Sequence, residues 1–463
     1  MTCIKAHPAA VFGFIAPFWI ITLFPFFRRI FIKGGGAALA AAELIGLFII
    51  FLQAYLRARA LEIEITETRL VIKKGVFIKG ETVIKKHNVS CLSFKTNPIL
   101  WLLSAETVSI DTEAGKKHKS EHKMLIKRAD ATALRSALGL CEGIKSFKMG
   151  AKRVTLMAAA VSSAAVGVLV AVPAINRIGR VLDKSFAGKI IETVRSGALF
   201  SSAFAAISLL FLFFYAVSFI FLLIRNISMQ IGLTAETIYI GAGIFPRRRT
   251  YFKKESVGSI VLEQRPIIRL SGRYIIKVGV AGYGGRRDDS VIVPVARKSE
   301  VEPFLRHIFS LERPNGGITP ARHLKYRFIR WRMLFSAAVP AAIYFLGCAF
   351  PVLWPLSAPL SVIILISLLY FLSLGFLNSR TARLSKSGDY LFAAGVSGFR
   401  VKEFFCRRER VGMFLIRRYP TDIRKKTAIL KIETRNENSE KMKVKYISYL
   451  AAQEYCKGFW KQQ

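Results

Sequence analysis

The chain alternates between long uncharged runs and blocks that are rich in charge. Five runs lack Asp, Glu, Lys and Arg, apart from Glu43 in the second; they lie at residues 6–27, 34–56, 154–176, 196–224 and 333–379. A helix needs about 20 apolar residues to cross the hydrocarbon core of a bilayer. The last run is long enough for two helices, and Pro351, Pro355 and Pro359 predict a turn between them. The pattern predicts an α-helical membrane protein with about six transmembrane helices, paired as hairpins at residues 6–56, 154–224 and 333–379.

The charged blocks, at residues 58–142, 226–312 and 380–463, have the form of repeats. In the first block, Val89 stands nine positions before Pro98, and Ile110 stands twelve after it. The same spacings recur, without a gap, at Val257, Pro266 and Val278 and at Val411, Pro420 and Ile432. Period-two alternation of apolar residues, as in 61–65, is typical of a half-buried strand. We therefore expect three α+β domains, each mostly antiparallel β with a C-terminal helix. The third copy is divergent, and its Gly395-Val396 aligns with Gly75-Val76 only after a shift.

A series of spaced residues in the first block carries a resemblance. It consists of Thr66, Leu70, Gly75, Val76, Phe77, Val89, Pro98 and the run Ile110-Asp111-Thr112-Glu113-Ala114-Gly115. This series, and the threefold alternation of hairpin and domain, resembles the bacterial membrane-flanked pleckstrin-homology-like (PH-like) domain family in its long form. The resemblance implies a PH-like barrel in each block and no enzymatic chemistry. Members of that family are associated in general terms with membrane stress and with resistance to membrane-active antimicrobial peptides.

The formal net charge of +41 narrows the choice of partners. Basic residues are scattered through all three blocks and accompany no nucleic-acid motif, so a nucleic-acid partner is not expected. Each basic residue near an anionic membrane surface contributes about 1 kcal/mol of attraction. We therefore expect anionic membrane lipids as partners, with a membrane-protein partner as the other interpretation. Lys and Arg beside the uncharged runs place both termini and all three blocks in the cytoplasm of a bacterium, at its cytoplasmic membrane.

Clusters of basic residues are the candidate lipid-binding sites. They are Lys73 and Lys74; Arg247, Arg248 and Arg249; and Arg407, Arg408 and Arg410. The triple arginine follows Gly243-Ile244-Phe245 at an expected strand–turn junction, where guanidinium groups are well placed to contact phosphates through paired hydrogen bonds. The alternative for every cluster is a solvated strand edge that charge protects from aggregation.

Other chemistry is not supported by the residue pattern. His118 and His122 have metal-ligand spacing, but they lie in a cationic stretch that predicts a solvated loop. The glycines between 279 and 285 precede Arg286 and Arg287 without a phosphate-binding motif, so they predict a turn. No catalytic arrangement is present, and we expect no cofactor, no metal and no enzymatic activity.

Two functions remain open from the residues alone. The first is a multipass membrane scaffold whose PH-like domains bind anionic headgroups or a protein. The second is a transporter or flippase-like protein with PH-like regulatory domains. Transport paths usually contain buried charges and broken helices, and here only Glu43 and a few prolines fit that description. The pattern therefore favours the scaffold.

Overall fold

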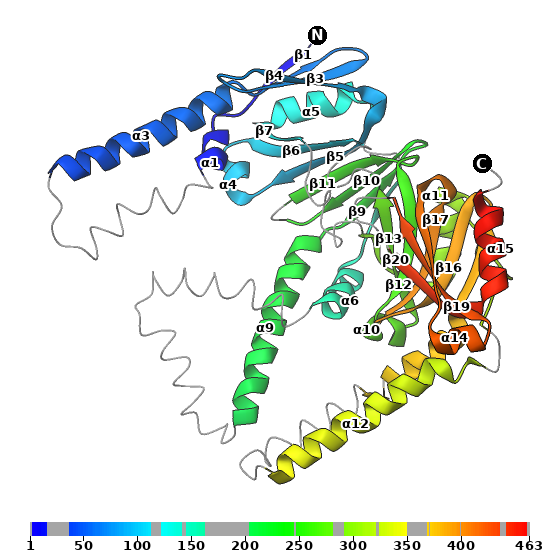
Figure 1. The fold of residues 1–463 in the computed structure, drawn as a ribbon. Helices are drawn as coiled ribbons and strands as arrows, with labels where there is room; N and C mark the ends of the chain where they lie inside the picture. Colours follow the sequence, from blue (N-terminus) through cyan, green and yellow to red (C-terminus); the bar gives the residue numbers. More distant parts are fainter. Residues whose placement is uncertain are drawn as a thin grey trace. The chain divides into compact units, whose positions relative to one another are not determined.

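The structure is a computed structural model. It describes residues 2–15, 37–112, 122–140, 145–162, 203–244, 247–280, 291–320, 324–349, 368–369, 371–398, 400–435 and 441–460. The chain divides into two compact units, whose elements are labelled in Figure 1. The first unit holds residues 1–148, 228–256 and 280–286, and the second holds 149–227, 257–279 and 287–463.

Each of the three copies has the same order of elements: three strands, a fourth strand, a five-residue helix, two more strands and a terminal helix. Copy 1 contains β2 (Glu62–Ile65), β3 (Arg69–Lys74), β4 (Gly80–Lys85), β5 (Val89–Thr96), α4 (Pro98–Leu102), β6 (Ala105–Thr112), β7 (His122–Lys127) and α5 (Arg128–Ala137). Copy 2 contains β9 (Gln230–Leu233), β10 (Thr237–Ala242), β11 (Arg247–Lys253), β12 (Val257–Gln264), α10 (Pro266–Leu270), β13 (Arg273–Val280), β14 (Val291–Arg297) and α11 (Lys298–Phe309). Copy 3 contains β15 (Arg383–Ser387), β16 (Tyr390–Ser397), β17 (Arg400–Arg407), β18 (Val411–Arg417), α14 (Pro420–Arg424), β19 (Thr427–Thr434), β20 (Lys441–Ser448) and α15 (Tyr449–Trp460). The predicted repeat is confirmed, although copy 2 is divided between the two units.

Three prolines occupy the same place in the three copies. Pro98, Pro266 and Pro420 each begin the five-residue helix, α4, α10 or α14, that follows the fourth strand. Proline suits the first position of a helix because its fixed φ is helical. The N–H group that proline lacks would have no hydrogen-bond partner within the helix at this position. The equivalence that the spacing predicted is therefore confirmed.

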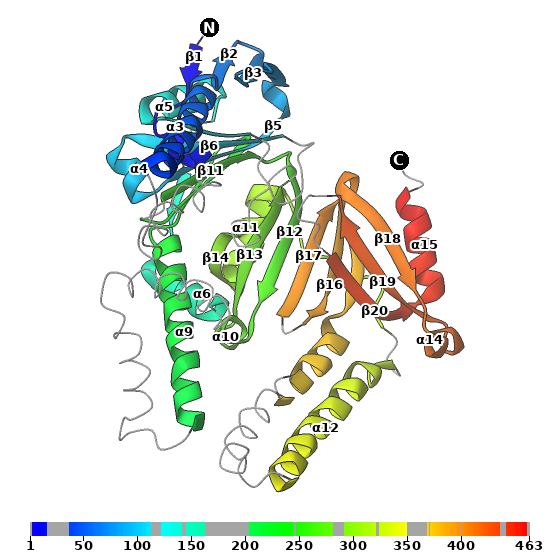
Figure 2. The ribbon, with the colours of Figure 1, turned by 60° about the vertical axis from the view of Figure 1, so that its left-hand side comes forward.

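Consecutive copies share their β-sheets. In the first unit, a seven-stranded sheet has the order β7-β6-β5-β11-β10-β9-β8, with β8 at Lys145–Lys148. In the second unit, a six-stranded sheet has the order β14-β13-β12-β17-β16-β15, and Figure 2 labels its strands β14 to β16 in turn. The outer strands form a four-stranded sheet, β1 (Thr2–Lys5) to β4, and a three-stranded sheet, β18 to β20. The prediction of three separate barrels is therefore wrong, because the open edge of β5 or β12 pairs with a strand of the next copy.

The two junctions between copies have the same register. Strands β5 and β11 pair with Leu92 opposite Tyr251, and β12 and β17 pair with Ile260 opposite Phe405. Tyr251 and Phe405 are equivalent, since each stands six residues before the valine that begins the fourth strand. All four side chains are completely buried. The repeat therefore extends beyond the single copy to the way one copy pairs with the next.

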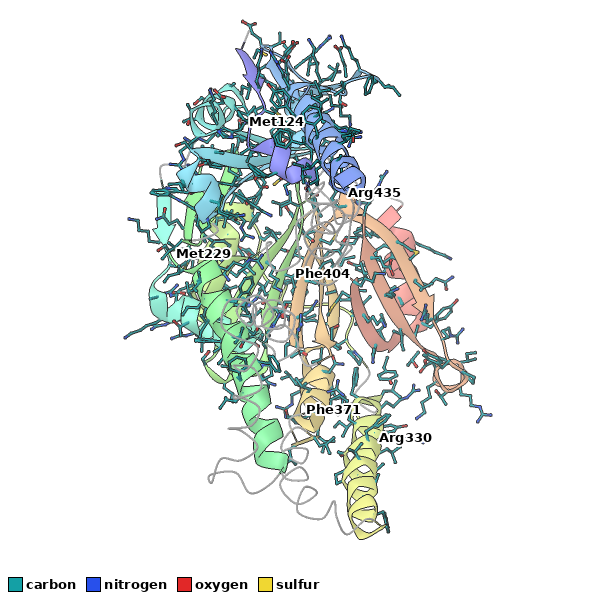
Figure 3. All side chains as sticks on the ribbon, turned by 90° about the vertical axis from the view of Figure 1, so that its left-hand side faces the viewer. Met124, Met229, Arg330, Phe371, Phe404 and Arg435 are labelled. Atoms are coloured by element: carbon teal, nitrogen blue, oxygen red, sulfur yellow. The ribbon has the colours of Figure 1, made fainter. Side chains whose placement is uncertain are left out.

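Each unit has an apolar core that includes residues from copy 2. In the first unit, strands β1 to β7 and helix α5 surround a core into which Tyr239 and Tyr251 of copy 2 also pack. Figure 1 shows α5 beside the β1–β4 sheet and strands β6 and β7. In the second unit, Val261 of copy 2 packs with copy 3, including Phe404 of β17, which is labelled in Figure 3. The cores thus reinforce the pairing between copies.

The expected membrane helices are not found. Among the described residues, no helix is both long and apolar enough to cross a membrane, so the prediction of about six transmembrane helices in three hairpins is wrong. In the third run α6 (Ala151–Val161) has 11 residues, too few to cross a bilayer. The described helix of the first run is α1 (Ala10–Ile15). The longer helices are α3 (Ala37–Arg59), α9 (Ala203–Asn226) and α12 (Arg327–Ala349). Residues 16–36, 163–202 and 350–367, which include the expected turns, lie outside the described residues.

Candidate functional site

A large cavity opens on copy 1. Its volume is about 980 Å³, and its walls come from α1, α3, the turn between β3 and β4, and strands β6 and β7. The buried side chains of Ile63, Ile72, Val108 and Ile110 line its inner part. Met124, labelled in Figure 3, lines it from β7. A mostly apolar concave surface of this size is typical of a ligand-binding site.

A glycine shapes the turn at the rim of this cavity. The β3–β4 turn comprises Gly75–Lys79, and Gly75 has a φ of +105°. A Cβ atom at this position would stand 1.9 Å from the carbonyl oxygen of Ile78. Only glycine fits without moving the backbone. Gly243, the equivalent residue of copy 2, also has a positive φ, of 84°.

In copy 3, the sequence alignment chose the wrong glycine. Gly395 lies inside strand β16, whereas Gly398 lies in the turn before β17 and has a φ of 61°. This turn is shorter than the β3–β4 turn, which displaces the glycine relative to the flanking strands. A short hairpin loop tolerates such a shift because the strand register is set by burial.

The β3–β4 turn exposes two large apolar side chains. Phe77 is 91% exposed and Ile78 is 88% exposed. Helix α3 adds Ile49 and Leu52 to the same cavity wall, and both are exposed as well. A cluster of exposed apolar side chains on this scale marks a surface that contacts protein or membrane.

Three cationic side chains stand around the apolar surface. Arg57 of α3, Lys74 of β3 and Lys123 of β7 line the cavity and are exposed. No hydrogen bond or ion pair joins them to another side chain in the part of the chain that the structure describes. The lining of the cavity therefore combines positive charge with apolar surface.

The arrangement fits an amphiphile with an anionic end. Apolar walls and the tip of the turn would contact hydrocarbon, while Lys and Arg at the rim would contact the charged group. His122 begins β7 and also lines the cavity. No cluster of His, Cys, Asp and Glu that could hold a metal occurs among the described residues.

The triple arginine does not lie on a turn. Arg247, Arg248 and Arg249 begin strand β11, where side chains alternate between the two faces. Arg247 is exposed, Arg248 is only 7% exposed, and Arg249 Nη2 lies 2.7 Å from Glu106 Oε1. Two of the three guanidinium groups are thus held inside the sheet, and only Arg247 is presented to the surroundings.

The other predicted cations also lie apart from one another. Lys73 donates to Glu64 of β2, and this hydrogen bond raises the pKa of Lys73. Lys74, its neighbour, lines the cavity. In copy 3, Arg407 Nε is 3.9 Å from Glu409, and the guanidinium of Arg408 lies 5.3 Å from the ring centroid of Phe459. Arg410 is half-buried and has a partner within the protein. Of the predicted clusters, only Lys74 therefore belongs to the cavity.

Sequence reasoning missed most of the residues at this site. Arg57, Phe77 and Lys123 come from three elements that are separated in sequence. The available signal was Lys74-Gly75 followed by Val76-Phe77-Ile78, in which an apolar run follows a turn glycine directly. Period and composition alone do not distinguish a strand from an exposed turn of the same residues.

Several earlier hypotheses fall partly outside the described residues. His118 and the glycines at 282, 284 and 285 are not described. Glu43 lies in α3. Gly279 lies in β13.

Comparison with known proteins identifies one family. The family described as "Bacterial PH domain" matches residues 10–140 and, a second time, residues 156–312. The two matches together cover more than half of the chain and correspond to copies 1 and 2 with the segments that precede them. No curated protein matches the chain, and no solved structure does. The third copy is assigned by its order of elements and by the spacing of Val411, Pro420 and Ile432.

Proposed function

Because the chain belongs to the bacterial PH domain family, we propose that it binds anionic lipid through the cavity and the β3–β4 turn of copy 1. Phe77 and Ile78 enter the lipid surface, and the cations around them contact phosphate. The observation that supports this proposal is the pairing of two almost fully exposed apolar side chains with Arg57, Lys74 and Lys123.

The energetic reasoning favours lipid over water for this turn. Burying a Phe or Ile side chain completely is worth about 1.5–3 kcal/mol. Each basic residue close to an anionic surface adds about 1 kcal/mol. Copy 1 supplies both contributions within one turn and its neighbours, so a modest apolar insertion is reinforced by charge.

We place this lipid surface at the cytoplasmic face of a bacterial membrane. The excess of 70 Lys and Arg over 29 Asp and Glu suits an anionic leaflet. A role in membrane stress or in resistance to membrane-active peptides belongs to the same proposal. It would follow if occupancy of the cavity reports on the exposure of anionic lipid.

Vesicle binding by the purified full-length chain tests the proposal. Binding should be stronger to vesicles of phosphatidylcholine with phosphatidylglycerol than to phosphatidylcholine alone. It should weaken with added salt, because exposed charges are screened over about 8–10 Å. The double substitution Phe77→Ser with Ile78→Ser should lower the partition coefficient about tenfold, since much of the apolar contact is lost.

Matched controls distinguish binding at the cavity from nonspecific adsorption to vesicles. Leu270→Ser removes an apolar side chain that is 90% exposed on α10, far from the cavity in sequence, and should leave binding unchanged. Lys74→Gln should lower binding to anionic vesicles, whereas Lys148→Gln, at an exposed residue outside the cavity, should not. Equal binding of the unaltered chain to neutral and anionic vesicles would rule the proposal out and favour a protein partner.

The triple arginine now has a different expected behaviour. Replacing all three arginines would disrupt the sheet, because Arg248 is buried and Arg249 is paired with Glu106. Arg247→Gln is the informative change, since Arg247 alone is exposed. We expect it to reduce vesicle binding less than Lys74→Gln does.

A further inference from the structure

Two of the edge strands in the described sheets are equivalent to strands that pair between copies elsewhere in the repeat. Strand β4 is the last strand of the β1–β4 sheet, and β18 is the first strand of the β18–β20 sheet. Their equivalents elsewhere in the repeat are paired with each other: β11 with β5, and β17 with β12. Strand β4 therefore corresponds to the strand that each copy contributes to the previous copy, and β18 to the strand that receives one.

Burial differs sharply between the paired and the unpaired strands. Val83 of β4 is equivalent to Tyr251 and Phe405, which are both 0% exposed, yet Val83 is 55% exposed. Met413 of β18 is equivalent to Cys91 and Ser259, at 1% and 0%, yet Met413 is 43% exposed. The same positions of the repeat are thus buried wherever a neighbouring copy is present.

The receiving edge keeps the local geometry of its paired equivalent. In copy 1 the pairing of β5 with β6 shifts register between Val89 and Cys91, and in copy 3 the pairing of β18 with β19 shifts between Val411 and Met413. These are the same repeat positions, so β18 and β5 bend at the same place.

The edge of β18 also lacks the protection that exposed edges usually carry. From Val411 to Ile416 the strand contains no charged residue and no proline. Natural edge strands are normally blocked by charges, prolines or a covering element, because an open edge pairs with other strands. An apolar unblocked edge with a repeat-defined partner indicates a docking surface.

We propose that β18 of one chain pairs with β4 of a second copy of the same chain. The register of the two internal junctions carries over, so that Phe414 lies opposite Val83 and Leu415 lies opposite Thr82. The contact is antiparallel and uses two different surfaces, and repetition of such a contact produces rings or open chains of molecules.

Ion pairs between copies belong to the internal junctions and not to the proposed contact. Glu106 meets Arg249 at 2.7 Å, and Glu263 meets Arg400 at 3.3 Å. Glu81 of β4 is the repeat equivalent of Arg249, and in the proposed register it lies opposite Ile416 rather than opposite a basic residue. The proposed contact therefore depends on apolar side chains and on main-chain hydrogen bonds.

A disulfide between chains tests both the contact and its register. Thr82→Cys is placed in one tagged chain and Leu415→Cys in a differently tagged chain, both with Cys3→Ser because Cys3 is exposed. Residues directly opposite across an antiparallel pair have Cα atoms about 4.5–5.5 Å apart, which suits a disulfide. After mixing and mild oxidation, a product that carries both tags is expected.

Two further samples test whether the doubly tagged product reflects the proposed register and a contact between two chains. Glu81→Cys mixed with Leu415→Cys is one residue out of register, with side chains on opposite faces, and should give about tenfold less of the doubly tagged product. A single chain that carries both Thr82→Cys and Leu415→Cys reports closure within one molecule. The proposal is overturned if oxidation joins the two positions only within one chain, or if the in-register and out-of-register yields are equal.

Substitution of exposed residues gives a test without cysteine. Val83→Glu places a charge at a position that is exposed in the single chain but buried in the proposed contact. It should raise the dissociation constant for self-association about tenfold or more, because an unpaired carboxylate would be buried. Leu102→Glu changes a side chain on α4 that is 79% exposed and should have no effect on self-association. Unaltered self-association in Val83→Glu would contradict the proposal. These measurements are made without vesicles, so their outcome does not depend on lipid binding.

Discussion

The junction in the first unit and the junction in the second unit share a backbone register but not their polar contacts. In the first, Glu106 of copy 1 meets Arg249 at 2.7 Å and Arg128 at 3.4 Å. In the second, Glu263 of copy 2 lies within 3.3 Å of a nitrogen of each of Arg265, Lys277 and Arg400. These two glutamates are not equivalent positions of the repeat.

The apolar contacts differ in a similar way. Tyr251 accepts a hydrogen bond from Arg135 Nη1 at 2.9 Å, whereas the equivalent Phe405 packs on Phe392, with ring centroids 4.9 Å apart. The repeat has thus kept the burial and the pairing of main chains while side chains diverged. Non-equivalent ion pairs in the two junctions would favour the correct neighbour over the wrong one, because a mismatched copy would bury an unpaired charge.

The largest expected effect is at Glu263. Glu263→Ala removes the acid between two largely buried cations, Arg265 and Lys277, and we expect a loss of about 3–5 kcal/mol in local stability. Hydrogen exchange with mass spectrometry should show faster exchange of β12 and β17 amides. Glu302→Ala, which removes an acid with 59% of its side chain exposed, is the control and should change little. Glu106→Ala should cost less, since its partners Arg249 and Arg128 have side chains that are 21% and 41% exposed and can turn to water. A larger effect at Glu106 would reverse the comparison.

Acid should affect the second junction at an unusually low pH. Burial by itself would raise the pKa of Glu263, but Lys277, Arg265 and Arg400 outweigh it and lower the pKa from 4.5 to about 2. The ionised carboxylate therefore stabilises the fold fully above pH 4.5, and this stabilisation is lost as pH falls towards 2. Its size is on the order of 3 kcal/mol. Exchange rates of β12 measured from pH 5 to pH 2.5, corrected for intrinsic rates, should rise in the unaltered chain and change less in Glu263→Gln. Parallel pH curves for the two chains would refute this assignment.

The hairpin turns that contain Gly75 and Gly398 should differ less in the stability cost of an alanine substitution. Gly75→Ala combines a φ of +105° with a Cβ that would overlap the carbonyl oxygen of Ile78, and should cost about 2 kcal/mol or more. Gly398→Ala has a φ of +61° with open space around the new Cβ, and should cost about 1 kcal/mol. Only Gly75→Ala should also weaken vesicle binding. Comparable loss of vesicle binding in Gly398→Ala would argue against the turn of copy 1 as the lipid contact.

The smallest expected effect comes from a substitution that makes the first junction resemble the second. Tyr251→Phe removes the hydroxyl that Arg135 contacts and leaves an aromatic ring, as in copy 3 at Phe405. We expect a loss of about 1 kcal/mol, the usual net value of such a hydrogen bond. Exchange of the β5 and β11 amides measures it. An unchanged rate would mean that packing alone holds this strand.

The repeat was predictable because its anchors are local. Val89, Pro98 and Ile110 mark a strand, a helix start and the next strand, and each is decided by residues within a short window. Pairing between β5 and β11 depends on which open edge is nearest in space, and no local pattern contains that information. The shared sheets therefore could not be anticipated from periodicity.

The candidate site was mostly hidden for the same reason. Three adjacent arginines in a sequence suggest a basic patch, but in strand β11 they point alternately to opposite faces, and two are held in the sheet. The useful cations, Arg57 and Lys123, are single residues on separate elements. The uncharged runs were also misleading, because no described helix within them is both long and apolar enough to cross a membrane.

The position of Tyr251 in the core of copy 1 has a consequence during synthesis. Arg135, its partner, leaves the ribosome 116 residues earlier. At roughly 5–20 residues per second, that interval lasts on the order of 10 s. Throughout it, the edge of β5 has no partner from copy 2, and the nascent first domain exposes an unpaired strand edge to any chain nearby. Slow translation between residues 135 and 251 would therefore prolong the stage at which this edge can pair with another chain. A chaperone that covers β5 during this interval would reduce aggregation.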